Sequence, residues 1–186
     1  MKKVAVKYSG GTDSTAATVM VAEAFDKVHL VTYRHSGIRH INNSTHHLSR
    51  LRELYGEDKF EHVIIDMDRL FKEVTFSRYV KNIRRYGFFN LTTCGLCKLA
   101  MHVRTILYCL DEGIDHVVDG ANINSSHFPA QMKEVIDELR LLYAEFGITF
   151  TNPVYDYAFP DDIDWLHKMA QLLYRFLRIS FMAEAP

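Results

Sequence analysis

Short apolar runs alternate with longer segments of helical period along this chain. The short runs are rich in β-branched residues and predict strands at Lys3–Tyr8, Val28–Tyr33, His62–Asp66, His116–Asp119 and Ile148–Asn152. The longer segments predict helices at about 13–25, 43–55, 69–86, 97–112, 129–146 and 161–179. Such alternation is typical of strand–helix crossovers around a parallel sheet. We therefore expect an α/β protein with a doubly wound, five-stranded, mainly parallel sheet and helices on both faces.

No internal repeat or Pro/Gly-rich linker divides the chain, so we expect one domain over residues 1–186. The segment 161–179 is more apolar than docking on its own sheet requires. Two interpretations remain open for it: a helix buried wholly within its own domain, or a surface through which the protein forms a homo-oligomer.

Composition and charge narrow the class of protein. Apolar residues make up 48% of the 186 residues, enough for one substantial core. A net charge of -1 and a pI near 6.8 argue against a surface that binds nucleic acid throughout, so any polyanion would bind a local basic patch. The three cysteines and the lack of a signal-peptide apolar region favour the cytoplasm. No apolar stretch approaches the roughly 20 residues that cross a bilayer, and we expect no membrane role.

The most informative segment lies between the first strand and the first helix. It consists of Ser9, Gly10, Gly11, Thr12, Asp13 and Ser14. The glycines allow successive backbone N–H groups to converge on phosphate oxygens at the positive end of the helix. The spacing matches neither Gly-x-x-x-x-Gly-Lys-Ser/Thr nor Gly-x-Gly-x-x-Gly. We expect a nucleotide ligand; the alternative is a turn whose Ser and Asp only cap the helix.

Ser-Gly-Gly-x-Asp-Ser after a first strand resembles the pyrophosphate loop of the PP-loop ATP pyrophosphatases. These adenylating enzymes include tRNA thiolases, NAD and GMP synthetases and 7-cyano-7-deazaguanine synthase. The resemblance implies a HUP/Rossmann-like fold and cleavage of ATP to AMP and pyrophosphate. Backbone N–H groups of Gly10–Ser14 would bind pyrophosphate, helped by the Ser9 and Ser14 hydroxyls. Asp13 would support the turn or bind Mg²⁺. Strand alternation predicts that Lys7, just before the loop, points away from the site.

Polar residues also follow other predicted strands, and ligands of open parallel sheets bind at these carboxyl ends. Tyr33 and His35 lie at the end of the second strand. The segment that contains Gly120 and Asn122 follows the fourth and resembles the Gly-x-Asn segment beside the nucleotide and acceptor in several pyrophosphatases. We assign these four residues to the nucleotide pocket. For the segment after the fourth strand, an ordinary turn-rich exit is the alternative.

A Cys-x-x-Cys segment, Cys94 to Cys97, precedes the fourth strand. By itself it is compatible with a redox pair, half of a zinc site or part of an iron–sulfur site. It resembles the Cys-x-x-Cys segment of tRNA thiolases, which implies sulfur transfer. A structural zinc site needs four ligands, and the chain has no second such pair. An iron–sulfur cluster would need Cys109, about three helical turns away and expected in the core, or a partner's ligand, and is not favoured.

A basic segment lies just upstream of the cysteines. Its cations recur at helical spacing and comprise Arg78, Lys81, Arg84 and Arg85. Aromatic residues are interleaved with them, namely Tyr79, Tyr86, Phe88 and Phe89. Such a face is suited to tRNA, through phosphate neutralisation and base stacking, and is also typical of a solvated helix with core aromatics.

Together these features predict an enzyme that uses Mg-ATP to adenylate an acceptor and then transfers sulfur to it. The acceptor would be a nucleobase or a related small molecule, and a separate protein would supply the sulfur. Cys94 or Cys97 would carry the sulfur or attack the intermediate, and the other would resolve a disulfide. Asp13 completes the residues with an expected catalytic role. The alternatives are nitrogen incorporation, as in 7-cyano-7-deazaguanine synthase, and a non-catalytic ATP-binding module.

Overall fold

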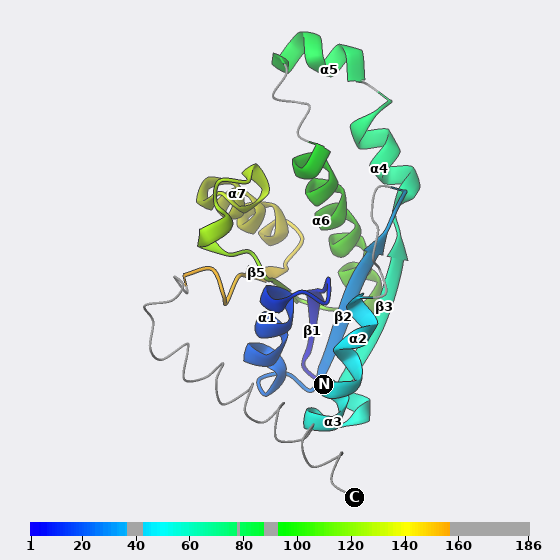
Figure 1. Ribbon diagram of the computed structural model, residues 1–186, viewed down its shortest axis with the longest axis vertical. Helices are drawn as coiled ribbons and strands as arrows, with labels where there is room; N and C mark the ends of the chain where they lie inside the picture. Colours follow the sequence, from blue (N-terminus) through cyan, green and yellow to red (C-terminus); the bar gives the residue numbers. More distant parts are fainter. Residues whose placement is uncertain (37–42, 78, 88–92, 157–186) are drawn as a thin grey trace, which may run out of the picture.

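A five-stranded, all-parallel sheet organises the protein (Figure 1). The computed structural model describes residues 1–36, 43–77, 79–87 and 93–156. The strands are β1 (Lys3–Lys7), β2 (Lys27–Arg34), β3 (Phe60–Asp66), β4 (His116–Asp119) and β5 (Thr149–Thr151). Their order is β3-β2-β1-β4-β5, so the expected doubly wound α/β fold is confirmed. The strand order reverses between β1 and β4, the position where such sheets bind ligands.

Helices cover both faces of the sheet. They are α1 (Thr12–Ala22), α2 (Asn43–His46), α3 (Leu48–Tyr55), α4 (Asp68–Thr75), α5 (Tyr79–Tyr86), α6 (Thr93–Glu112) and α7 (Lys133–Ala144), with 3₁₀ turns η1 (Glu57–Lys59), η3 (Ile123–Ser125) and η4 (Pro129–Gln131). Alternate residues of β1 serve opposite cores: Val4 and Val6 pack with α1 and α3, whereas Ala5 packs with α4, α6 and α7. Lys7 follows Ala5 by two positions, so its side chain lies on the α6 and α7 face.

Several helices differ from the sequence prediction. The expected helix 43–55 is divided into α2 and α3, and the expected helix 69–86 into α4 and α5. At the end of α4, the Thr75 hydroxyl donates to the Phe71 carbonyl, and just beyond it the Ser77 hydroxyl donates to the Glu73 carbonyl; such bonds to the carbonyl four residues earlier weaken or bend a helix. The α6 helix begins at Thr93 rather than at 97, so Cys94 and Cys97 both lie within its first turns.

Two further differences concern the second half of the chain. The α7 helix begins at Lys133, because residues 129–131 form the η4 turn with Pro129 at its start. The expected helix 161–179, and with it the expected self-association surface, lies outside the described residues. Within the described part of the chain, no helix is long and apolar enough to span a bilayer.

Candidate nucleotide-binding site

The loop between β1 and α1 has the backbone of an anion site. Gly10 has φ 78°, a left-handed conformation that favours glycine, and Gly11 is the extended N-cap of α1. No side chain caps this helix end, so the N–H groups of its first turn remain open to a ligand. Gly11, Thr12 and Asp13 are exposed, which makes this end of the helix accessible.

Two serine hydroxyls brace the loop from within. Ser9 Oγ accepts from the Gly11 N–H at 3.3 Å and lies 3.2 Å from Ser14 Oγ. Ser14 Oγ in turn donates to the Gly11 carbonyl at 3.0 Å. The two hydroxyls therefore stabilise the turn in this structure, and their hydrogen bonds to pyrophosphate stay a prediction.

Gly120 joins the exit of β4 to the first turn of α1. A Cβ atom at Gly120 would lie 2.8 Å from both Asp13 C and Ser14 N, and 2.9 Å from Ser14 Cα. All three atoms belong to backbone, which cannot yield as a flexible side chain can. Only glycine permits this contact, and the residues after β4 thereby help to fix the shape of the loop.

Asn122, the other assigned residue of this segment, has a local turn role. Its side chain accepts from the Asn124 N–H at 2.8 Å and caps η3, while its own N–H donates to Gln131 Oε1 at 2.9 Å. This is the turn-rich exit that the alternative interpretation expected. Its contact with a nucleotide stays a prediction.

A buried charge network lies at the same edge, where register pairs Lys7 with Asp119. Lys7 Nζ lies 3.0 Å from Asp119 Oδ2, and Lys98 Nζ lies 2.8 Å from Oδ2 and 3.0 Å from Oδ1 of the same carboxylate. The Lys7 and Asp119 side chains are only 3% and 5% exposed, whereas Lys98 is 25% exposed. Lys98 is therefore the member of the network that reaches solvent or a ligand.

Burial and mutual attraction set the protonation of this network. Burial lowers the pKa of Lys7 to about 7, although Asp119 partly offsets the effect. Burial alone would raise the pKa of Asp119, but the attraction of Lys7 and Lys98 outweighs it and holds that pKa well below its usual range. Asp119 is therefore ionised at neutral pH, while Lys7 exchanges its proton near neutrality.

His102 completes the network from α6. Its Nε2 lies 2.8 Å from Lys7 Nζ, and its Nδ1 lies 3.0 Å from the Tyr143 hydroxyl. Burial, and secondarily Lys7, lowers the pKa of His102 well below its usual value. The imidazole is consequently neutral.

Sequence reasoning missed this network. Lys7 was expected to point away from the site, but its side chain joins Asp119 and Lys98 at the carboxyl end of the sheet. Two signals were present: a lysine in an otherwise apolar central strand requires a buried partner, and Lys98 and His102 are spaced to share one helix face.

A thiol and an imidazole meet at the end of β2. His35 Nε2 lies 3.1 Å from Cys97 Sγ, and the His35 ring stacks on Phe71 with centroids 3.9 Å apart. Burial lowers the pKa of His35, so the ring is neutral and can accept a proton. Cys97 lies near the positive end of α6, which favours a thiolate. The backbone of Cys94 lies in the same turn; its side chain is outside the described residues.

Two other expected residues are placed in the core. Tyr33 is buried among the residues under α6, and its hydroxyl pairs with Thr105 Oγ1, so it does not line the open edge. Cys109 is fully buried, as expected, and burial raises its pKa to about 12. Cys97 and Cys109 lie about 18 Å apart along one helix and cannot bind one cluster. No group of three or more metal-binding side chains occurs among the residues that the structure describes.

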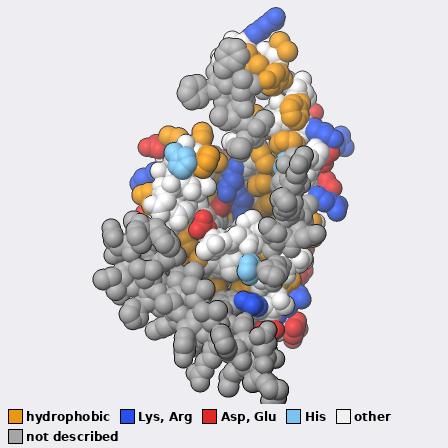
Figure 2. Space-filling model, in the orientation of Figure 1, with side chains coloured by type: hydrophobic (Ala, Val, Ile, Leu, Met, Phe, Trp, Pro, Cys, Tyr) orange, Lys and Arg blue, Asp and Glu red, His pale blue; other side chains and the backbone are white. Residues whose placement is uncertain are grey.

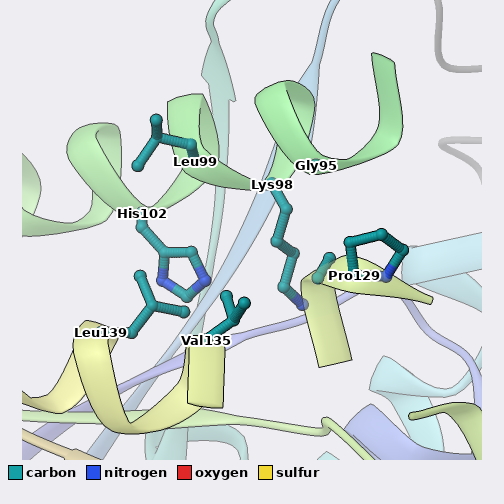
Figure 3. A pocket seen from close by; sticks show the side chains of 8 residues that line it. Gly95, Lys98, Leu99, His102, Pro129, Val135 and Leu139 are labelled. Atoms are coloured by element: carbon teal, nitrogen blue, oxygen red, sulfur yellow. The ribbon is translucent and has the colours of Figure 1, made fainter. Parts of the chain in front are cut away.

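A pocket of about 150 Å³ adjoins the charge network (Figure 3). Residues of α6, the η4 turn and α7 line it: Gly95, Lys98, Leu99, His102, Pro129, Ala130, Val135 and Leu139. Figure 2 shows lysine and arginine side chains in the middle of this face of the molecule, with hydrophobic side chains on either side.

The basic segment forms α5, which stands beyond the carboxyl edge of the sheet (Figure 1). Lys81, Arg84 and Arg85 are exposed on it, as are Tyr79 and Val80. Four of the expected contributors, Arg78, Phe88, Phe89 and the Tyr86 side chain, lie outside the described residues.

Comparison with known proteins supports the fold. No protein-family model and no curated protein sequence matches the chain. The chain is similar to a crystal structure of a predicted subunit of tRNA methyltransferase from Methanocaldococcus jannaschii, with a TM-score of 0.52 and 18% identity. The match covers 86% of this chain and 71% of that chain. At this identity the likeness shows a shared Rossmann-like α/β fold.

Proposed function

We propose that this protein is an ATP-dependent RNA-modifying enzyme. It binds Mg-ATP at the loop after β1, adenylates a carbonyl oxygen of an acceptor nucleobase and replaces that oxygen with sulfur. One observation carries the proposal: the glycine loop, fixed by Gly120, lies at the strand-order reversal where β1 and β4 also present the Lys7–Asp119–Lys98 network.

Binding of the triphosphate follows from the loop. Backbone N–H groups at the start of α1 donate hydrogen bonds to phosphate oxygens, and Lys98 adds a cation nearby. Asp13 is exposed beside these groups and suits Mg²⁺, which typically takes one or two carboxylates together with phosphate oxygens. Such an ion would offset the negative charge of the phosphates.

Adenylation turns the acceptor's oxygen into a leaving group. The carbonyl oxygen forms a bond to the α-phosphorus of ATP, and the bond from that phosphorus to pyrophosphate breaks. The acceptor carbon then carries an AMP group, which departs with the original oxygen in the next step.

The contact between His35 and Cys97 supports sulfur as the incoming atom. A donor protein places a persulfide on Cys94 or Cys97; its terminal sulfur attacks the adenylated carbon, and AMP leaves. The second thiolate then attacks the first cysteine's own sulfur, which breaks the sulfur–sulfur bond. The base keeps its thiocarbonyl, the two cysteines form a disulfide, and a cellular thiol reduces it. His35 Nε2 lies 3.1 Å from Cys97 Sγ and accepts the proton of the Cys97 thiol.

Two observations support RNA as the acceptor class. The α5 helix exposes Lys81, Arg84 and Arg85 next to Tyr79, a combination suited to phosphates and unstacked bases. The similar solved structure is described as a predicted subunit of tRNA methyltransferase.

The test is mass spectrometry of nucleosides from cells with and without this chain. We expect a thionucleoside that disappears without the chain and in Cys94→Ser and Cys97→Ser strains, but persists in a Cys109→Ala control. Purified Cys97→Ser protein should still bind ATP. Thiolation retained in both serine variants would overturn the sulfur step.

Other outcomes separate the alternatives. A deazaguanine change that is insensitive to both cysteines would indicate nitrogen incorporation. If no nucleoside changes, and no acceptor triggers release of AMP and pyrophosphate, the protein is a nucleotide sensor.

A further inference from the structure

We propose that Lys7 takes up a proton when a polyphosphate binds the loop after β1, and that this proton allows Lys98 to pair with the phosphates. Lys7 is then a positioning residue of the phosphate site, since it acts on the ligand through Asp119 and Lys98. The inference rests on the proposed function to the extent that the polyphosphate is that of ATP. It is carried by the number of charges in the network, their burial and the distance from Lys7 to the loop.

Two cations share one carboxylate in this network. Lys7 Nζ lies 3.0 Å from Asp119 Oδ2, and Lys98 Nζ lies 2.8 Å from the same oxygen. Among the residues that the structure describes, Asp119 supplies the only carboxylate that pairs with either lysine. With both ammonium groups protonated, the network carries one unmatched positive charge. Because an unmatched buried charge is costly, the network either binds an anion or gives up one proton.

Burial decides which lysine gives up the proton. The Lys7 side chain is 3% exposed, whereas the Lys98 side chain is 25% exposed and keeps part of its hydration. Loss of hydration disfavours the charged form of a lysine, so Lys7 holds its proton less tightly than Lys98 does. The pKa of Lys7, which burial lowers to about 7, agrees with this assignment.

The other titratable groups around Lys7 do not supply the missing negative charge. From α6, His102 Nε2 lies 2.8 Å from Lys7 Nζ, and burial keeps this imidazole neutral by lowering its pKa. From α7, the Tyr143 hydroxyl lies 3.0 Å from His102 Nδ1, and burial raises the pKa of that tyrosine. From β2, Tyr33 is buried with its hydroxyl on Thr105, and burial raises its pKa as well. The compensating charge therefore comes from a bound anion.

The phosphate site lies within electrostatic reach of Lys7. Lys7 is the last residue of β1, and Gly10 and Gly11 of the loop follow a few positions later. An extended chain advances about 3.3 Å per residue, which places the loop within roughly 10 Å of the Lys7 backbone. At this separation and an effective dielectric constant of about 20, one negative charge favours the protonated lysine by about tenfold. A bound polyphosphate therefore strengthens the hold of Lys7 on its proton.

Protonation of Lys7 also determines what Lys98 can do. If Lys7 is neutral, Lys98 compensates the buried Asp119 carboxylate alone within the described network, and its departure would leave a buried charge unpaired. If Lys7 is charged, it compensates Asp119 at 3.0 Å, and Lys98 is able to turn to a phosphate. Figure 3 shows Lys98 and His102 extending from the same side of α6. The proton on Lys7 and the phosphate at the loop thus favour each other.

The experiment measures binding of Mg-ATP and of magnesium pyrophosphate to the full chain by isothermal titration calorimetry. Titrations in buffers of different ionisation enthalpy count the protons that the protein takes up. At pH 7.5 we expect the wild type to take up about half a proton through Lys7. From pH 7 to pH 9 its affinity should fall about five- to tenfold, because the proton on Lys7 is lost over this range.

Two variants isolate Lys7. Lys7→Met should lack this proton uptake, and its affinity at pH 7 should match that of the wild type at pH 9 within about twofold. Lys27→Met is the matched control: Lys27 also lies in a strand beside a carboxylate, Glu61 at 3.9 Å, but it begins β2 at the opposite end of the sheet. It should keep the wild-type uptake. The difference between wild type and Lys7→Met removes other groups that titrate in this range, including the ligand and the Cys97 thiol.

Proton uptake that is equal in Lys7→Met and the wild type would overturn the inference. The wild-type titration is itself a test, so the inference stays falsifiable if Lys7→Met does not fold. Binding of Mg-ATP to the wild type without proton uptake contradicts the inference and leaves the proposed function standing. Proton-linked binding of pyrophosphate without binding of Mg-ATP contradicts the proposed function and leaves the inference standing, whereas binding of neither contradicts both.

Discussion

The two halves of the sheet's carboxyl edge are built for different chemistry. At β1 and β4, Lys7, Asp119 and Lys98 form a charged network with contacts of 2.8 to 3.0 Å. At β2, a neutral His35 stacks on Phe71 and contacts the Cys97 thiol. One half suits anions, and the other suits a proton acceptor beside a nucleophile.

A single helix serves both halves. Lys98 and His102 lie on the α6 face directed at β1 and β4, whereas Cys97 and Thr105 contact residues at the end of β2. Neighbouring residues on a helix point about 100° apart, so Cys97 and Lys98 reach different strands from adjacent positions. The rotation of α6 about its axis therefore divides the carboxyl edge of the sheet into an ionic half at β1 and β4 and a neutral half at β2.

The largest effect should come from breaking the ionic half. Asp119→Asn removes the carboxylate from two cations and should lower the free energy of unfolding by about 3 to 5 kcal/mol, because a buried charge is left uncompensated. Urea denaturation measures this loss. The double variant Lys7→Met with Asp119→Asn should recover much of it; a double variant as unstable as the single would contradict the charge explanation.

The next effect concerns the close contact between Gly120 and the backbone of the loop. Gly120→Ala should cost about 1 to 3 kcal/mol in unfolding free energy and weaken ATP binding, since its Cβ overlaps backbone at 2.8 Å. Gly11→Ala is the control for stability: its φ of -78° is ordinary and its Cβ meets only Ser9 Oγ, at 3.4 Å. Because alanine is less favoured than glycine at a helix N-cap, Gly11→Ala should cost less than about 1 kcal/mol. Equal losses in the two variants would contradict the packing argument.

A smaller effect concerns pH. The pKa of Lys7 is about 7 in the folded protein and 10.5 ordinarily, so between these values the unfolded chain binds more protons. Lys7 therefore makes stability rise with pH in this range, by up to about 1.4 kcal/mol per pH unit. Urea denaturation at pH 7, 8 and 9 should show this slope in the wild type and a reduced slope in Lys7→Met. Parallel slopes would indicate that Lys7 keeps an ordinary pKa.

The smallest effect tests the neutral half. In a Cys94→Ser background, His35→Phe keeps an aromatic ring against Phe71 but removes the proton acceptor from Cys97. Alkylation of Cys97 by iodoacetamide at pH 7, followed by peptide mass spectrometry, should slow by a few fold. Stability should change by less than about 1 kcal/mol. An unchanged rate would show that the imidazole does not activate the thiol.

The strands and the glycine loop could be predicted from the sequence, because both depend on short stretches of chain. Hydrophobic runs identified all five strands, and β1 differs only in ending at Lys7 rather than Tyr8. The loop was identifiable because its glycines are required by the local backbone conformation, as the left-handed Gly10 shows. Gly120 was selected by resemblance, but its physical reason, contact with backbone at Asp13 and Ser14, is visible only in three dimensions.

The charge network could not be derived in the same way. It depends on the register of β1 with β4 and on the rotation of α6, both set by packing between distant segments. For the same reason Tyr33 was assigned to the nucleotide pocket, although its hydroxyl pairs with Thr105 in the core.

The adjacency of Cys97 and Lys98 on α6 also constrains how related sequences can vary. One residue inserted between them would turn Lys98 and His102 by about 100° around the helix axis, away from Asp119, while Cys97 stayed beside His35. The chain length separating thiol from ammonium is thus as restricted as the residues themselves. Insertions in natural relatives that keep both halves should fall outside the stretch from Cys97 to Thr105.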